Sequence, residues 1–160
     1  MKPTVAALLA LLLLSGCAAA PGSTPFPAGA LADYQLGGAY DPPEGVTVVA
    51  RDSTEEPAAG LYSICYVNGF QTQPGDDWPE ELLVQVDGQP LVDPNWPDEH
   101  LIDISSPTAR TGAAARLDPT LRRCADAGFD AVEFDNLDSY TRSEGRLTLD
   151  DAVAFATLLV

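Results

Sequence analysis

The stretch from Gly60 to Phe70, GLYSICYVNGF, is strongly β-favouring, and its centre is almost entirely apolar or aromatic. A strand with one face in water alternates polar and apolar residues. A continuous apolar run is instead typical of a strand covered on both faces, as in parallel sheets with helices packed against them. This stretch therefore favours an α/β fold.

Shorter segments of the same character occur on either side of this run. We predict strands over residues 33–36, 45–52, 60–70, 100–105 and 130–135. Residues 107–127 favour a helix that Gly128 ends. Because Pro119 lies inside it and Asp118 can cap a new start, we expect a break or kink near Leu117. The strand at 100–105, this helix and the strand at 130–135 then form a right-handed βαβ unit.

The last segment, LTLDDAVAFATLLV, predicts a helix. Thr148 suits its N-cap, and Asp150 and Asp151 suit its first turn, where the helix dipole favours acids. The segment runs to Val160 with no helix-stop signal. We therefore expect either that the sequence is truncated at its C-terminus or that the protein is a remnant, and that a further strand should follow this helix.

Composition narrows the classes of function. The chain has 160 residues, enough for one domain, and 46% of them are hydrophobic, which argues against a disordered acidic tail. Eight basic and 24 acidic residues give a formal charge of −16. Such a charge repels nucleic acid, so nucleic-acid binding is excluded, and it favours cationic partners.

The N-terminus resembles a bacterial lipoprotein signal. Lys2 precedes an apolar run from Val5 to Leu14, and the sequence LSGC then ends at Cys17. We predict a signal peptide over residues 1–16, acylation of Cys17, and a flexible tether over residues 17–30. The protein would be exported and lipid-anchored to the cell membrane, facing outward. The alternative is an ordinary secretory signal with a chance cysteine.

The other two cysteines, Cys65 and Cys124, could form one disulfide in an oxidising compartment, or remain free and buried. Two cysteines and one histidine provide no zinc-binding spacing. Calcium binding by the acids after residue 130 is a further hypothesis, but the spacing of an EF-hand loop fails there. We therefore predict no metal and no cofactor.

Carboxylates recur where predicted strands end, at Asp52, Asp103 and Asp135. In parallel α/β folds that edge is where sites are built. The sequence is equally consistent with Asp52 as a turn residue and with Asp103 as a cap to the following loop. In GFDAVEFDNLDSY, residues 128–140, the period of a strand puts Glu133 and Asp135 on one face.

The segments YQL, ICYVNG, WPDEHLIDI, GFDAVEFDNLDSY and LTLDDAVAFA together resemble the glycoside hydrolase family 114 domain, which includes endo-α-1,4-polygalactosaminidases. The resemblance covers Tyr34 to Val160 and is most specific over residues 128–140. It implies a (β/α)8 TIM barrel, of which this chain covers about the first half. It also implies hydrolysis of α-glycosidic bonds in galactosamine-containing polysaccharide.

The resemblance also implies roles for residues. Asp135 is the favoured catalytic carboxylate and Asp138 the alternative, with the second catalytic carboxylate on a later strand. Substrate binding is implied for a further set of side chains: Glu133, Asn136, Asp103, Tyr66, Asn68 and Tyr140.

One departure from the family pattern leaves the sugar open. FQTQPGDDW follows CYVNG where an acid and an arginine are commoner. An acidic groove suits a cationic galactosamine polymer. A second hypothesis is a non-catalytic surface lipoprotein that binds amino-sugar polysaccharide with the same groove.

Overall fold

The computed structural model describes residues 24–160. The predicted signal peptide and Cys17 lie outside the described residues. Of the predicted tether, residues 24–30 contain no helix or strand. They nevertheless contact the sheet, because the ring of Phe26 lies edge-on to Tyr62 with centroids 5.6 Å apart.

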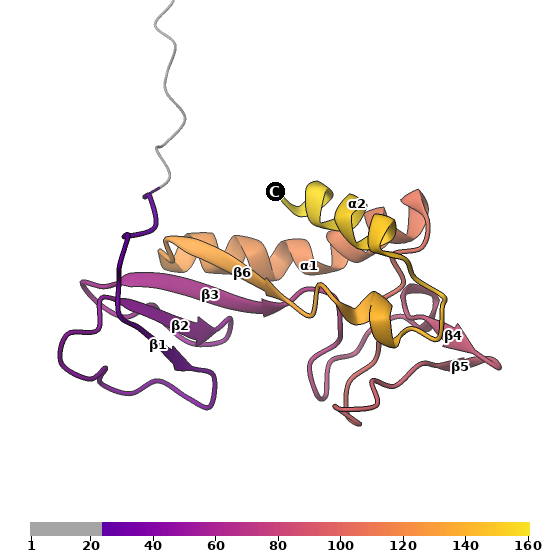
Figure 1. Ribbon diagram of the computed structural model, residues 1–160, viewed down its shortest axis with the longest axis horizontal. Coiled ribbons are helices and arrows are strands. Elements are labelled where there is room, and N and C mark those ends of the chain that lie inside the picture. Colours follow the sequence, from indigo (N-terminus) through magenta and orange to yellow (C-terminus); the bar gives the residue numbers. More distant parts are fainter. Residues whose placement is uncertain (1–23) are drawn as a thin grey trace, which may run out of the picture.

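The centre of the structure is a four-stranded parallel sheet in the order β1-β2-β3-β6 (Figure 1). Its strands are β1 (Ala32–Gln35), β2 (Val48–Asp52), β3 (Tyr62–Asn68) and β6 (Ala131–Asp135). The predicted parallel α/β arrangement is therefore confirmed. Asn68 pairs with Asp135 in register, so β3 and β6 end at the same edge of the sheet.

The long helix α1 (Pro107–Ala127) is capped by Ser106, whose hydroxyl accepts from the N–H of Ala109 at 3.1 Å. Gly128 ends it in the left-handed conformation with φ 92°. Of the predicted break or kink near Leu117, the break is wrong, because the helix continues through Pro119, and the kink stays a prediction. Buried residues on both sides of the proline, Leu117 and Cys124 among them, hold the helix against the core, and this packing offsets the cost of about 3 kcal/mol.

The core lies between the sheet and the helices. Helix α2 (Leu149–Leu159) lies with α1 on one side of the sheet, and within residues 24–160 no helix covers the other side (Figure 1). Thr148 caps α2 reciprocally with Asp151, as the sequence predicts. Phe155 of α2 is fully buried, with its ring edge-on to Phe70 at 5.2 Å. Among the helices of residues 24–160, none combines the length and apolarity needed to cross a bilayer.

The chain makes a long excursion between β3 and α1, over residues 71–105. It contains the short helix η1 (Glu80–Leu82) and the small antiparallel pair β4 (Gln85–Val86) and β5 (Gln89–Pro90). The predicted strand at 100–105 is wrong, since only isolated antiparallel bridges form there, and they join the residues Gln71 to Leu101, Leu83 to Ile102 and Val92 to His100. Pairing within the excursion uses these backbone groups, so β6 pairs directly with β3.

A disulfide joins β3 to α1. Cys65 and Cys124 are bonded, with their Cα atoms 6.0 Å apart and a separation of 59 positions in sequence. Both are almost completely buried. Of the two alternatives that the sequence leaves open, the bonded one is therefore correct. The crosslink holds the long helix on the sheet.

Removing this crosslink should destabilise the domain. Closing a loop of this length lowers the entropy of the unfolded chain enough to stabilise the fold by about 4 kcal/mol in the chain-entropy model. We expect the double variant Cys65→Ala, Cys124→Ala to lose stability of this order in urea unfolding. Reductant should lower the stability of the unaltered protein and leave that of the double variant unchanged; equal sensitivity of both proteins would contradict the bond.

An arginine connects the end of β6 with the excursion. Arg142, in the short helix η2 (Ser139–Arg142), donates from Nε to Asp93 at 2.5 Å and from Nη2 to Gln71 at 3.1 Å. Asp93 is fully buried. Burial would raise the pKa of its carboxyl, but hydrogen bonds from Arg142 and from the N–H groups of Asn95 and Trp96 outweigh burial and hold that pKa below its usual value.

Breaking this ion pair should cost much more than removing a surface arginine. Arg142→Met leaves Asp93 buried without its cation, so we expect the free energy of unfolding to fall by about 3 kcal/mol at pH 7. Arg146→Met is the matched control, because Arg146 is exposed, and its effect should stay within about 0.5 kcal/mol.

The difference in the free energy of unfolding between the Arg142→Met variant and the unaltered protein should also depend on pH. In the unaltered protein, the stability due to the depressed pKa of Asp93 is present above about pH 3.9 and is lost as the pH falls through the folded-state value. In the variant, burial raises that pKa, so acid relieves the unpaired charge. The gap in the free energy of unfolding should therefore begin to narrow above about pH 3.9 and should narrow further as the pH falls through the folded-state pKa of the unaltered protein. A gap that stays constant in urea unfolding curves would contradict the assigned role.

Candidate active site at the ends of the strands

Asp135 ends β6 on the sheet face opposite the helices. Its Oδ2 accepts a hydrogen bond of 2.6 Å from the hydroxyl of Tyr66, and its Oδ1 accepts from the N–H of Asn136 at 2.8 Å. Burial, and then the bond to Asp135, raises the pKa of Tyr66 well above its ordinary value. Tyr66 therefore stays protonated and serves as a donor that orients the carboxylate.

Glu133 lies on the same face as Asp135, as strand periodicity predicts. Tyr34 of β1 donates to both of its carboxylate oxygens, at 2.8 and 2.7 Å. These bonds, with burial and the negative charges nearby, raise the pKa of Tyr34 to about 12. Two tyrosines from different strands thus hold the two acids of β6 in place.

The carboxylate of Asp135 faces a hollow of about 220 Å³. Within the described part of the chain, this hollow is lined by three acids and no basic side chain. Aromatic Trp96, more than half exposed, stands at its margin. The full lining consists of Leu36, Asp52, Tyr66, Gln73, Trp96, Glu99, Asp135 and Asn136. An acidic hollow of this kind favours a cationic or hydroxyl-rich ligand.

Glu99 is the acid of this hollow that sequence reasoning missed. Its side chain accepts from Nδ2 of Asn68 at 3.0 Å. Burial raises its pKa above the usual value. The hydrogen bond from Asn68 acts to lower that pKa, but the negative charges of Asp93 and Asp135 raise it further. Burial and the neighbouring acids therefore disfavour the charged form of Glu99.

Two asparagines brace the site. Asn136 takes the left-handed conformation, φ 64°, directly after β6, which asparagine tolerates better than most residues. Its Nδ2 donates to Oδ1 of Asn68 at 2.9 Å. Gly69 follows Asn68, and a Cβ there would lie 2.9 Å from the ring of Phe134, so the close approach of these two strand ends requires glycine.

Three of the sequence-predicted site residues lie elsewhere. Asp138 is two-thirds exposed, is paired with Nη1 of Arg142 at 2.9 Å, and lines an apolar hollow under α2 together with Tyr140. Asp103 lies on a separate hollow beside Arg146. The structure thus brings together Tyr66, Asn68, Glu133, Asp135 and Asn136, and it separates Asp103, Asp138 and Tyr140 from them.

The residues missed in the sequence come from loops. Trp96 and Glu99 belong to the WPDEH stretch, and Gln73 to the QTQPGDD stretch. An aromatic residue close to acids in a loop is a weak signal of a sugar site, but nothing in the pattern tells which strand end the loop reaches. Asp52 fits both of its readings, since it lines the hollow and also accepts from Thr54 as a turn residue.

Among residues 24–160, no group of three or more His, Cys, Asp or Glu side chains is placed to hold a metal ion. The candidate site presents carboxylates, tyrosine hydroxyls and amides, which are groups suited to acid–base chemistry and to sugar hydroxyls.

Solved structures share this fold. Ega3 from Aspergillus fumigatus, solved in complex with galactosamine, matches with 25% identity and a TM-score of 0.62 over 82% of this chain and 54% of that one. The glycoside hydrolase domain of PelA from Pseudomonas aeruginosa matches with 18% identity and a TM-score of 0.52 over 84% and 55%. No curated protein sequence matches the chain.

The chain thus spans about half the length of the solved structures it matches. A family model, that of glycoside hydrolase family GH114, matches residues 15–160. The parallel sheet and its packed helices fit part of the (β/α)8 barrel of that family, which confirms the predicted fold. The chain therefore belongs to glycoside hydrolase family GH114.

Proposed function

We propose that the protein hydrolyses α-glycosidic bonds in galactosamine-containing polysaccharide, with Asp135 as one of two catalytic carboxylates. The observation that carries this proposal is the position of Asp135, at the C-terminal end of a parallel strand and in a hollow with two further acids. Family membership supports the reaction class, and the galactosamine complex of Ega3 supports the sugar.

Hydrolysis of a glycosidic bond needs two carboxyl groups, one to protonate the leaving oxygen and one to act as a nucleophile or to activate water. Asp135 suits the second role, because the hydroxyl of Tyr66 and the N–H of Asn136 both donate to its carboxylate and hold it in place at the end of β6. The partner is expected on a later strand, beyond residue 160. In this proposal Glu99 and Asp52 bind the sugar, with their charges facing its ammonium group.

Asp135 is better placed than Asp138 to be the catalytic carboxylate, because Asp138 is paired with an arginine. Its carboxylate is held by Arg142 and faces away from the acidic hollow, so it is poorly placed to reach the same sugar. We therefore assign Asp138 to positioning the turn after β6. Tyr140 and Asp103 would contact substrate only if it extends well beyond this hollow.

The decisive experiment measures binding and cleavage of α-1,4-linked galactosamine oligomers. Binding is measured with the chain of 160 residues, and cleavage, as released reducing ends, with the longest polypeptide that its reading frame encodes. Asp135→Asn should lower the cleavage rate at least about a hundredfold. Asp118→Asn on the exposed side of α1 makes the same charge change and should have no effect.

The outcomes separate the two candidate functions. Saturable binding without cleavage would favour the non-catalytic lipoprotein that uses the same hollow. Oligomers that are fully N-acetylated lack the positive charge, and they should bind more weakly at low salt, because the attraction of the acids is lost. If the protein neither binds nor cleaves any galactosamine oligomer, the proposal is refuted.

We also propose that the protein is exported and anchored through Cys17 on the outer side of the membrane. The LSGC sequence supports this placement, and the Cys65–Cys124 disulfide suits an oxidising compartment. In cells fed labelled palmitate, Cys17→Ser should abolish incorporation of label into the protein. Unchanged labelling of that variant would show that Cys17 is not the anchor.

A further inference from the structure

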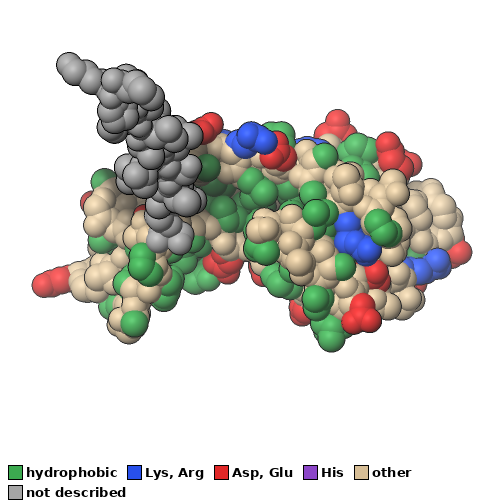
Figure 2. Space-filling view, turned by 90° about the horizontal axis from the view of Figure 1, so that it is seen from above, with side chains coloured by type: hydrophobic (Ala, Val, Ile, Leu, Met, Phe, Trp, Pro, Cys, Tyr) green, Lys and Arg blue, Asp and Glu red, His purple; other side chains and the backbone are tan. Residues whose placement is uncertain are grey.

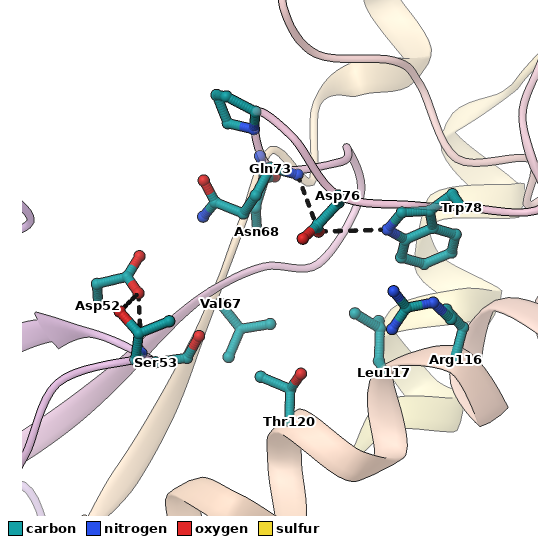
Figure 3. Close-up of a pocket in the computed structure, with 12 residues that line it drawn as sticks. Asp52, Ser53, Val67, Asn68, Gln73, Asp76, Trp78, Arg116, Leu117 and Thr120 are labelled. Atoms are coloured by element: carbon teal, nitrogen blue, oxygen red, sulfur yellow. Dashed lines mark hydrogen bonds between the residues drawn. The ribbon is translucent and has the colours of Figure 1, made fainter.

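A second hollow adjoins the candidate active site. Its volume is about 420 Å³, and it lies between the ends of β2 and β3, the loop from Gln73 to Trp78, and helix α1 (Figure 3). Asp52 and Gln73 line both hollows. The two hollows therefore lie on either side of a shared rim, and one extended ligand could occupy both.

The inner wall of this second hollow is apolar, and its margin is acidic. Val67 of β3 and Leu117 of α1 are both buried, and they face the hollow from opposite sides (Figure 3). Asp76 stands over them, where its Oδ2 accepts from the N–H of Gln73 at 3.3 Å and from the indole N–H of Trp78 at 3.4 Å.

The negative charges in the lining of this hollow are not neutralised by ion pairs. Arg116 is the one basic side chain in its lining, and its guanidinium lies 5.3 Å from the ring centre of Trp78 and donates to the carbonyl of Asp77. Among the described residues, neither Asp52 nor Asp76 forms an ion pair. The exposed carboxylate of Asp76 therefore remains available to a cation.

We infer that this hollow is an additional subsite, which holds a further hexosamine unit of the polymer bound at Asp135. An amino sugar carries an apolar C–H face, hydroxyls and an ammonium group. Val67 and Leu117 match the first, Gln73 and Thr120 the second, and Asp76 the third. The inference rests on the proposed function, and it extends the binding site over the rim formed by Asp52 and Gln73.

The two tryptophans of the chain report on the two hollows separately. Trp96 lines the hollow of Asp135, and Trp78 lines the second one. The test follows both indole N–H signals by NMR while the full chain is titrated with α-1,4-linked galactosamine disaccharide or hexasaccharide. The disaccharide should shift the signal of Trp96 alone, and the hexasaccharide should shift both.

Two variants make the test specific. Asp76→Asn should abolish the shift at Trp78, relative to the variant's own unliganded spectrum, and should weaken hexasaccharide binding about fivefold without changing disaccharide binding. Asp77→Asn is the matched control: it removes the same charge from the adjacent exposed position, outside the hollow's lining, and should bind both oligomers normally.

The outcomes distinguish this inference from the proposed function. The subsite is refuted if the hexasaccharide shifts only the indole N–H signal of Trp96 and binds the Asp76→Asn and Asp77→Asn variants with equal affinity. The proposed function is unaffected by that result. If neither signal responds to any galactosamine oligomer, the proposed function fails and the subsite fails with it. Unchanged spectra away from residue 76 in the unliganded variant show that folding is intact.

Discussion

The ion pair between Arg142 and buried Asp93 connects three parts of the chain that are far apart in sequence. Arg142 follows β6, Asp93 belongs to the excursion between β3 and α1, and Gln71, which also accepts from Arg142, begins that excursion. Because the pair is desolvated, its partners are tightly coupled. Arg142 also donates from Nη2 to Oδ1 of Asn136 at 3.2 Å, so the same side chain contacts the turn that follows Asp135.

The two faces of the sheet have separate tasks. On the helix side, the disulfide and the Phe70–Phe155 contact close a core, and apolar, acidic and arginine side chains mix on its outer surface (Figure 2). On the other side, Tyr66 and Asp135 face a small acidic hollow. Burial, and then the charges of Asp93 and Asp135, raise the pKa of Glu99, so a charged carboxylate there costs free energy, and the cationic sugar proposed above would offset that cost.

Much of the fold could be predicted because its signals are local. The strand periodicity at residues 131–135, the Ser/Thr caps and Gly128 each depend on neighbours within a few residues. Prediction failed where distant contacts decide the outcome. Residues 100–102 have strand-forming side chains but pair within the excursion, and α1 passes Pro119 because packing on both sides holds it. Glu99 was missed for the same reason, since it reaches Asp135 only through that excursion.

Residue order alone was sufficient for the α/β class, the helix ends, the acid at the end of β6 and the family resemblance, because periodicity, capping and short motifs act over a few residues. The tertiary structure decided that Cys65 bonds Cys124, that Asp138 pairs with Arg142 outside the hollow of Asp135, and that a second hollow adjoins the first across Asp52. These outcomes depend on contacts between segments that are distant in sequence. Such contacts are determined by the packing of the core and by buried charges, which exist only in the folded chain.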